Sequence, residues 1–387
     1  MTDSDPYQDI RPYHDSEIRP VLDRLLDTPE FISSIASFAY PTVSRFVPGI
    51  LNALTRRRLK SQLQSVNDVS GMQDVIAGYM DKMIERTTTG LTHSGLDLLP
   101  KGQSFLFISN HRDIAMDPAF VNYMLYHSGH DTLYIAIGDN LLKRPFVTDL
   151  MRLNKSFIVR RSLKGRELLK SSKLLSQYID HLVGNQHNVW IAQREGRAKD
   201  GIDRTDTALL KMLGMARKKE GLAAALNALN IVPVSISYEL DPCDELKAVE
   251  LQQKDEHGFF EKDEKSDIHS IVTGMVGNKG RVHVAFGELL KFAPEAEDDD
   301  IAALIDQQVL THYRIQSSNV LAIRMLAEDS PEMMGKLSAE GQQFIQEYSV
   351  DAGLAAAFKA RISAMPAKAQ PYALHMYANP VIGRYPA

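Results

Sequence analysis

Short apolar runs alternate with helical patterns between about residue 91 and residue 290, and this alternation is the clearest pattern in the chain. Apolar runs of four to eight residues bounded by polar residues predict buried strands. The predicted strands are 104–109, 132–137, 156–160, 188–193, 231–237 and 281–286. Because helices separate these strands, we expect an α/β fold with a mixed, largely parallel sheet flanked by helices.

The connections between the strands carry helix signals. Asp117 followed by Pro118 is typical of a helix N-cap with proline at the first helical position. A second amphipathic stretch ends at Gly184, and residues 205–230 predict a third helix. Residues 241–280 are polar and lack a clear period, so we expect an irregular connection between two strands there.

The changes of pattern divide the chain into three predicted regions. Residues 1–90 form an N-terminal helical region, residues 91–290 the α/β domain, and residues 291–387 a C-terminal helical region. The acidic stretch at 294–300 marks the second boundary.

The N-terminal region contains an apolar stretch, residues 31–54, that prolines interrupt and that Arg56-Arg57-Arg58-Leu59-Lys60 follows directly. Such a stretch beside a basic cluster suits an interfacial element that attracts anionic lipid. It also suits a helical hairpin that packs on a core and exposes a basic end, which is the more usual arrangement of amphipathic helices. The sequence leaves both interpretations open.

Composition narrows the function classes. The 387 residues are 44% hydrophobic and 24% charged, as in ordinary globular proteins. The net charge of −5 argues against a nucleic-acid partner. A single cysteine, Cys243, excludes an internal disulfide and fits a reducing cytosol. The acidic N-terminus predicts no secretory signal, and no apolar run reaches the ~20 residues of a membrane span. We expect a cytoplasmic protein. A peripheral position on the inner face of the cell membrane is compatible with this expectation.

The candidate chemistry begins at His111, which follows the first predicted strand. Imidazole suits a general base because its pKa lies near neutrality, and a carboxylate on its other nitrogen fixes the tautomer. Asp113 and Asp117 are the two candidates for that carboxylate. The alternative readings are an ordinary loop histidine and a simple N-cap aspartate.

Two related motifs are absent. His111-Arg112-Asp113 resembles the catalytic triplet of protein kinases, but Pro118 stands where the asparagine is expected and no Gly-rich phosphate loop precedes it. The chain also lacks the Gly-x-Ser-x-Gly elbow of serine hydrolases.

Fixed positive charge follows the third predicted strand, which ends in Arg160 and Arg161. Arginine binds phosphate through two parallel hydrogen bonds, so these side chains are candidates for a phosphate site. A solvated strand end is the alternative. The strand at 231–237 contains Pro233, which predicts an edge position or a bulge.

A second group of charged residues follows the strand at 188–193, in the turn Arg194-Glu195-Gly196-Arg197. Gly196 permits close approach of the backbone to a ligand. Arg194 and Arg197 are candidates to bind phosphate, and Glu195 could orient an arginine or a substrate hydroxyl. A plain surface turn remains the alternative.

In this order, the motifs resemble those of the glycerolipid acyltransferase superfamily, which includes glycerol-3-phosphate and 1-acylglycerol-3-phosphate acyltransferases. The family's first motif is matched by Asn110-His111, although Asp117 follows the histidine by six residues rather than five. Its other motifs are matched by Phe157-Ile158-Val159-Arg160, by Glu195-Gly196 within the third motif, and by Ile231-Val232-Pro233-Val234. The resemblance covers about residues 91–290 and suggests a divergent bacterial branch.

The resemblance implies the glycerolipid acyltransferase fold and an O-acyltransferase of phospholipid biosynthesis. Its donor would be acyl-CoA or an acyl carrier protein, and its acceptor a hydroxyl of glycerol 3-phosphate or 1-acylglycerol 3-phosphate. His111 would be the base, Asp117 or Asp113 its partner, and the residues that bind or shape the phosphate pocket would be Arg160, Arg161, Arg194, Glu195, Gly196 and Arg197. No cofactor beyond the thioester is implied, and no metal, because the twelve histidines are scattered. The alternatives are another lipid acceptor, such as a lysophospholipid or an aminolipid, and a non-catalytic lipid-binding adaptor.

Overall fold

The computed structural model describes residues 5–40, 42–261 and 266–387. The first four residues of the acidic N-terminus lie outside this range. The chain forms two compact units, the first built from residues 1–79 and 134–171 and the second from residues 80–133 and 172–387. The division into three regions by sequence stays a prediction.

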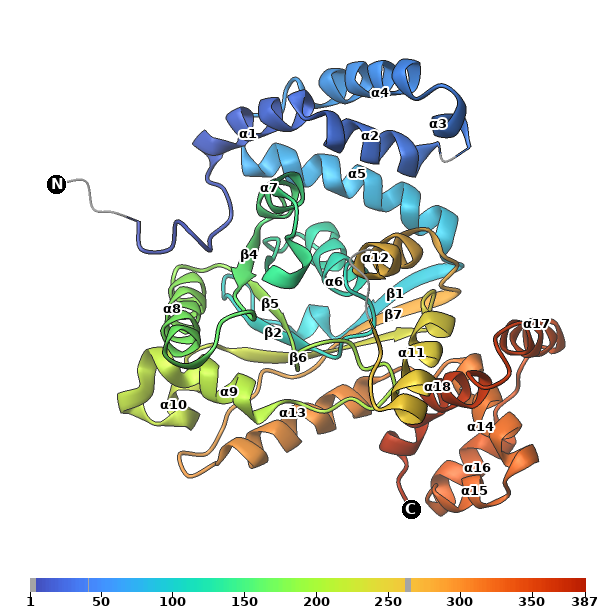
Figure 1. The fold of residues 1–387 in the computed structure, drawn as a ribbon. Helices are drawn as coiled ribbons and strands as arrows, with labels where there is room; N and C mark the ends of the chain where they lie inside the picture. Colours follow the sequence, from blue (N-terminus) through green and yellow to red (C-terminus); the bar gives the residue numbers. More distant parts are fainter. Residues whose placement is uncertain (1–4, 41, 262–265) are drawn as a thin grey trace. The chain divides into compact units, whose positions relative to one another are not determined.

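The second unit contains five strands in the order β1-β7-β6-β2-β5 (Figure 1). These strands are β1 (Gly90–Ser94), β2 (Leu106–Ser109), β5 (Val189–Ala192), β6 (Ile231–Tyr238) and β7 (Arg281–Phe286). Only the β6–β7 pair is antiparallel. The first unit adds the parallel pair β3 (Tyr134–Gly138) and β4 (Ser156–Val159). The predicted mixed, largely parallel sheet flanked by helices is confirmed.

All six predicted strands are present, and β1 is the strand that the sequence did not reveal. Its residues Gly-Leu-Thr-His-Ser contain no apolar run because β1 lies at the edge of the unit's sheet and pairs with β7 alone. The central strands are the reverse case. All eight residues of β6 and all four of β2 are buried, as expected for strands covered on both faces.

The prediction that Pro233 marks an edge or a bulge was wrong. Pro233 lies inside β6, which pairs with β2 on one side and β7 on the other. Its carbonyl accepts a hydrogen bond from Gly287 N at 2.8 Å, one residue beyond the end of β7. Proline has no N–H to donate to a neighbouring strand. At Pro233 no donor is missed, because the hydrogen-bond ladder between β6 and β7 has already ended there, and the central strand therefore tolerates the proline.

Helices cover both faces of the sheet in the second unit, with α6 on one face and α13 on the other (Figure 1). The helices of this unit are the part of α5 (Val69–Thr87) from Met80, the short η1 (Leu96–Leu98), α6 (Met116–His127), the part of α8 (Gly165–Gly184) from Ser172, α9 (Thr207–Leu213), η3 (Gly214–Glu220), α10 (Leu222–Asn227), α11 (Asp244–His257), α12 (Ser266–Val276), α13 (Asp298–His312), α14 (Ser317–Asp329), α15 (Glu332–Gly335), α16 (Ala339–Glu347), α17 (Ala352–Ser363) and α18 (Gln370–Arg384).

Two helix predictions were wrong in detail. The third helix is broken into α9, η3 and α10, and Gly221, with φ of +87°, separates the last two pieces. The stretch expected to be irregular contains α11 and α12 in its described part. The period of α11 was hidden because this helix buries charged residues where an amphipathic helix has apolar ones.

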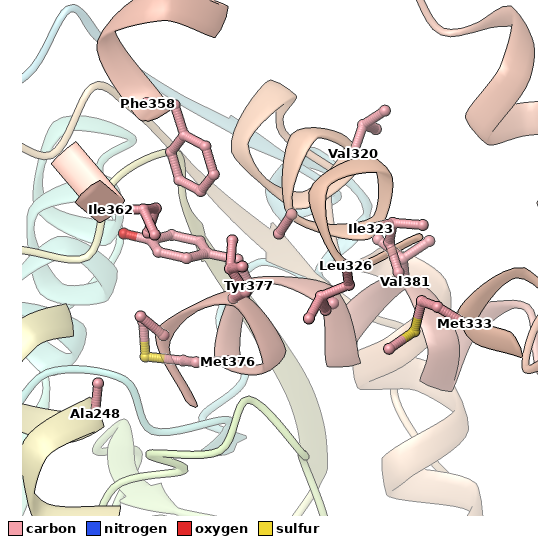
Figure 2. Packing of buried hydrophobic residues seen from close by; sticks show 14 of the residues in the cluster. Ala248, Val320, Ile323, Leu326, Met333, Phe358, Ile362, Met376, Tyr377 and Val381 are labelled. Atoms are coloured by element: carbon pink, nitrogen blue, oxygen red, sulfur yellow. The ribbon is translucent and has the colours of Figure 1, made fainter. Parts of the chain in front are cut away.

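The C-terminal helices have a core of their own in the second unit. Val320 and Ile323 of α14 pack with Phe358 of α17 and Tyr377 of α18, and Ala248 brings α11 into the same cluster (Figure 2). The rings of Phe358 and Tyr377 meet edge to face with centroids 5.1 Å apart. These contacts attach α11 to the C-terminal helices.

The first unit is mainly helical. It contains α1 (Asp15–Asp27), α2 (Pro29–Ala39), α3 (Val43–Phe46), α4 (Pro48–Leu63), η2 (Asp139–Leu141), α7 (Pro145–Leu153), and the beginnings of α5 (Val69–Thr87) and α8. A cluster of buried apolar residues, among them Leu22, Phe31, Leu63, Met72 and Leu153, packs α1, α2, α4, α5 and α7 together.

Candidate active site

His111 lies two residues beyond the end of β2, and its ring is held by Asp117. The distance from His111 Nδ1 to Asp117 Oδ2 is 2.9 Å. The carboxylate is fully buried, whereas 14% of the histidine side chain is exposed. An imidazole oriented through Nδ1 leaves Nε2 as the nitrogen that can take a proton from a substrate.

Asp117 is held on both oxygens, which fixes the geometry of the pair. Oδ2 also accepts the backbone N–H groups of Arg112 at 2.6 Å and Asp113 at 2.9 Å. Oδ1 accepts the hydroxyl of Tyr238 at 2.7 Å. The prediction that Asp117 is the N-cap was wrong in position, because α6 begins at Met116 and its N-cap is Ala115. The side chain turns back onto the preceding loop instead.

Asp113 caps the beginning of α6 instead of contacting His111. Its Oδ1 accepts the backbone N–H groups of Ala115 and Met116, at the beginning of α6, at 2.9 and 2.8 Å. Burial raises the pKa of Asp113, and the nearby Asp117 carboxylate raises it further. Asp113 therefore closes the loop before the helix, and Asp117 is the partner of His111.

Tyr238 and Trp190 complete the surroundings of the pair. Burial, reinforced by Asp117, raises the pKa of Tyr238 well above 10, so its hydroxyl stays a donor. The Trp190 ring lies 5.9 Å from the His111 ring, edge to face, and its indole N–H donates to Ser109 Oγ at 3.0 Å. Neither residue was a sequence candidate. Their positions on the apolar strands β5 and β6 were the only signal.

Arg112 is a further residue that the sequence did not single out. It is 5% exposed, and its guanidinium contacts Asp203 Oδ2 at 2.5 Å and the carbonyls of Ala198 and Gly201 at 3.2 Å. A buried arginine needs such partners because an unpaired buried charge is strongly unfavourable. The side chain thus ties the histidine loop to the loop that follows β5.

The predicted turn Arg194-Glu195-Gly196-Arg197 lies in that second loop, directly after Gln193, which is the first residue beyond β5. Ala198 N donates to the carbonyl of His111 at 2.8 Å, so the two motifs are adjacent. Gly196 has φ of +76°, a conformation that favours glycine. Glu195 is exposed at the tip of the turn.

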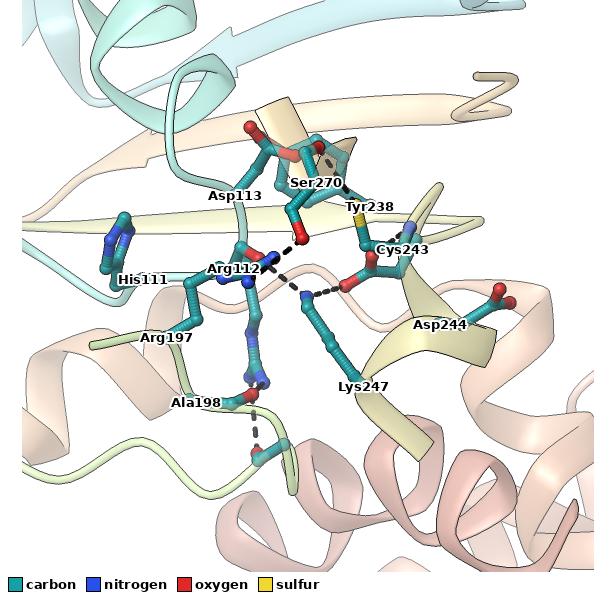
Figure 3. Close-up of polar contacts among 12 residues, drawn as sticks. His111, Arg112, Asp113, Arg197, Ala198, Tyr238, Cys243, Asp244, Lys247 and Ser270 are labelled. Atoms are coloured by element: carbon teal, nitrogen blue, oxygen red, sulfur yellow. Dashed lines mark hydrogen bonds and ion pairs between the residues drawn. The ribbon is translucent and has the colours of Figure 1, made fainter. Parts of the chain in front are cut away.

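Both arginines of the turn contain nitrogen atoms suited to an anion. Arg197 donates to Ser270 Oγ of α12 at 3.4 Å, and Arg194 lies 3.7 Å from Asp200 Oδ1. Figure 3 shows Arg197 beside the histidine loop. Among the described residues, Arg194 Nε and Arg197 Nη1 are buried without a hydrogen-bond partner. Buried donors of this kind are usually satisfied, so a bound anion is a natural partner.

Arg160 and Arg161 belong to the first compact unit, after β4. Arg160 lies 3.7 Å from Asp9 Oδ2, and the backbone N–H of Arg161 donates to Asp139 Oδ1 at 3.1 Å. Both residues follow the strand as predicted, and their role in substrate binding stays a prediction.

Within residues 5–40, 42–261 and 266–387, no group of three or more His, Cys, Asp or Glu side chains is arranged to hold a metal ion. In the same residues, no helix is both long and apolar enough to cross a membrane.

Comparisons with known proteins bear on the segment that carries this site. Residues 90–237 match the family model described as "Acyltransferase". The chain is 28% identical over 217 residues to a glycerol-3-phosphate acyltransferase of Baumannia cicadellinicola, which covers 52% of this chain and 24% of that protein. It is 30% identical over 168 residues to the corresponding protein of Pseudoalteromonas atlantica, covering 42% of this chain and 20% of that protein. The matches therefore span about a quarter or less of those relatives.

Among solved structures, the chain is similar to the 1-acyl-sn-glycerophosphate acyltransferase PlsC of Thermotoga maritima, with 12% identity and a TM-score of 0.40. That match covers 73% of this chain and 95% of the other. The family match contains both His111 and Asp117 and runs through the turn at 194–197 to β6. The segment that carries the site, residues 90–237, is therefore similar to the acyltransferase family.

Proposed function

We propose that the protein transfers a fatty acyl group from an acyl thioester, acyl-CoA or acyl carrier protein, to a hydroxyl of glycerol 3-phosphate or 1-acylglycerol 3-phosphate in phospholipid biosynthesis. The observation that carries the proposal is the His111–Asp117 pair at 2.9 Å, with the ring partly open to solvent and the turn of Arg194 and Arg197 bonded to the histidine loop.

The proposed step uses Nε2 of His111. It takes the proton of the acceptor hydroxyl while the oxygen forms a bond to the thioester carbonyl carbon. The carbon–sulfur bond then breaks, and the proton passes from the imidazolium to the departing thiolate. Asp117 stabilises the imidazolium between these events. No acyl-enzyme is needed, because the acceptor itself attacks the thioester.

The widened spacing of six residues between His111 and Asp117 does not separate the two side chains. An adaptor without activity would have no need of a buried carboxylate held by four partners, two of them backbone N–H groups of the preceding loop. This geometry favours an enzyme over the adaptor.

The test is a thioester assay on the purified protein with His111→Ala. We expect turnover to fall by at least about a hundredfold while the thermal unfolding transition is retained, because a positioned base contributes about 10²–10⁴ in rate. Near-normal turnover in this variant would refute the proposal.

A phosphate series addresses the acceptor. Arg197→Met is expected to raise KM for glycerol 3-phosphate by at least about tenfold, since a charged hydrogen bond contributes about 1.5–3 kcal/mol. The same change should leave the reaction with a phosphate-free acceptor, such as a monoacylglycerol, within about twofold in KM. An equal effect on both acceptors would argue for another lipid substrate.

A peripheral membrane position is supported by an exposed patch in the first unit. The patch comprises the apolar side chains that α2, α3 and α4 leave in solvent, namely Phe38, Tyr40, Val43, Phe46, Val47, Ile50 and Leu54, each at least 42% exposed. Large apolar residues gathered in this way mark an interaction surface. The opposite sides of α2 and α4 are buried at Ile32 and Leu51, so part of this stretch packs on a core. The exposed part supports the interpretation as an interfacial element.

Basic side chains border the patch. Arg45, Arg57 and Lys60 are exposed on α3 and α4, and each basic residue near a membrane surface adds about 1 kcal/mol of attraction to anionic lipid. We expect the triple variant Phe46→Ser, Ile50→Ser and Leu54→Ser to bind phosphatidylglycerol vesicles at least about tenfold more weakly. Phe259→Ser, which changes an equally exposed aromatic residue (67%) of the second unit, is the control. Equal binding of the vesicles by both variants would exclude the patch as the membrane-binding surface.

A further inference from the structure

Lys247 contacts the candidate site from outside the acyltransferase segment. It lies on α11 and is 1% exposed. Its ammonium donates to the carbonyl oxygen of Arg112 at 2.6 Å and forms an ion pair with Asp241 (Figure 3). The proposed step does not use this residue. A lysine is almost never fully buried unless its charge is paired, so the partners of Lys247 are informative.

The carbonyl that Lys247 binds belongs to the peptide group between Arg112 and Asp113. The N–H of that same peptide, on Asp113, donates to Asp117 Oδ2 at 2.9 Å. In a trans peptide the N–H and the C=O point in opposite directions, so this one peptide lies between a cation and a carboxylate. Its dipole is aligned with both charges, and hydrogen bonds in such a chain strengthen one another.

The charge on Lys247 is compensated and held from the C-terminal helices. Asp241 N donates to the Tyr377 hydroxyl at 2.9 Å, and that hydroxyl donates to Asp244 Oδ2 at 2.7 Å. Arg361 binds both oxygens of Asp244, at 2.6 and 2.8 Å. Tyr377 and Arg361 come from α18 and α17, so the beginning of α11 is fastened by helices more than a hundred residues downstream.

We propose that Lys247 is a positioning residue for the His111–Asp117 pair, acting through the Arg112–Asp113 peptide, and that α17 and α18 keep it in place. The inference rests on the proposed function only for its catalytic consequence; the placement of the carboxylate can be measured independently of turnover.

The test variant is Lys247→Met, which keeps the length of the side chain and removes the donor. Lys279→Met is the matched control, because Lys279 is also fully buried and its ammonium also binds carbonyls, those of Met275 and Gly277 instead of that of Arg112. Two readouts are used. The first is kcat and KM with the acyl thioester, and the second is the downfield proton resonance of His111 Nδ1–H in ¹⁵N-labelled protein.

We expect Lys247→Met to lower kcat by about ten- to a hundredfold, the range of one hydrogen bond to a charged group, with KM for the thioester within about twofold. The His111 resonance should shift or broaden. In Lys279→Met both the kcat and the resonance should remain near those of the unchanged protein. A folded Lys247→Met with unchanged kcat and an unchanged resonance would overturn the inference.

Two further outcomes are also decisive. If the unchanged protein shows no acyl transfer but Lys247→Met alone shifts the resonance, the proposed function fails and the positioning role stands. If Lys247→Met does not fold, the double variant Lys247→Met with Asp241→Asn removes the unpaired carboxylate. The same loss of kcat and shift of resonance are expected there, and their absence would overturn the inference.

Discussion

The assignment of Asp117, rather than Asp113, as the partner of His111 makes a sharp comparison possible. Asn at either position preserves size and one carbonyl oxygen but removes the charge. In Asp117→Asn, the Tyr238 hydroxyl can accept from the new amide, so we expect the loop to keep its conformation. The change then removes the charge that faces the imidazolium.

The magnitude follows from the geometry. Two unit charges 2.9 Å apart, the distance between His111 Nδ1 and Asp117 Oδ2, attract by about 6 kcal/mol at an effective dielectric constant of about 20. Because each 1.36 kcal/mol changes a rate about tenfold, Asp117→Asn should lower kcat by up to about four orders of magnitude. Asp113→Asn keeps the acceptor for Ala115 and Met116, and we expect its kcat to stay within about threefold of the unchanged protein.

The assay is thiol release from acyl-CoA at saturating glycerol 3-phosphate, with thermal unfolding measured in parallel. Asp113→Asn as damaging as Asp117→Asn would show that the loop, not the pairing, controls the rate. A folded Asp117→Asn within tenfold of the unchanged protein would refute the electrostatic reasoning altogether.

Three further measurements examine the surroundings of the site. Tyr238→Phe removes one hydrogen bond to the buried Asp117 carboxylate, and urea unfolding should show a loss of about 1.5–3 kcal/mol. Gly274→Ala would place a Cβ atom 2.1 Å from Asp113 Oδ2, so we expect a lower Tm and a lower kcat; an unchanged Tm would contradict this packing. Burial lowers the pKa of His283 to about 4 from 6.5. The unfolded chain therefore takes up the proton first as the pH falls, and up to about 3 kcal/mol of stability is lost between pH 6.5 and 4; urea titrations of His283→Gln should show a flatter pH dependence.

Local signals predicted those parts of the molecule that local interactions determine. The strands with apolar runs and the helix that closes at Gly184 are of this kind, because burial on both faces or one face leaves a period in the sequence. β1 left no such trace, since an edge strand needs only hydrogen bonds from β7.

The candidate site was predictable as a set of motifs but not as a network. The sequence favoured Asp117 as the partner of His111 but left Asp113 as a rival, because sequence does not show in which direction a carboxylate turns. Tyr238 lies 121 residues from Asp117, and Lys247 lies 135 residues from Arg112. Contacts between residues so far apart in the sequence form only when the sheet has folded. Neither the composition nor the hydrophobic period of a single sequence predicts them.

The pairing of β1 with β7 limits how the segment that matches the acyltransferase family could be excised or grafted. β1 opens the family segment at Gly90, yet its strand partner spans Arg281–Phe286, well past residue 237. A protein truncated at residue 237 would lack β7, so β1 would be unpaired and one side of β6 would be exposed. Exposed strand edges of this kind promote edge-to-edge aggregation. A chimera built from this chain must therefore extend at least through Phe286, so that β7 is present to pair with β1 and β6.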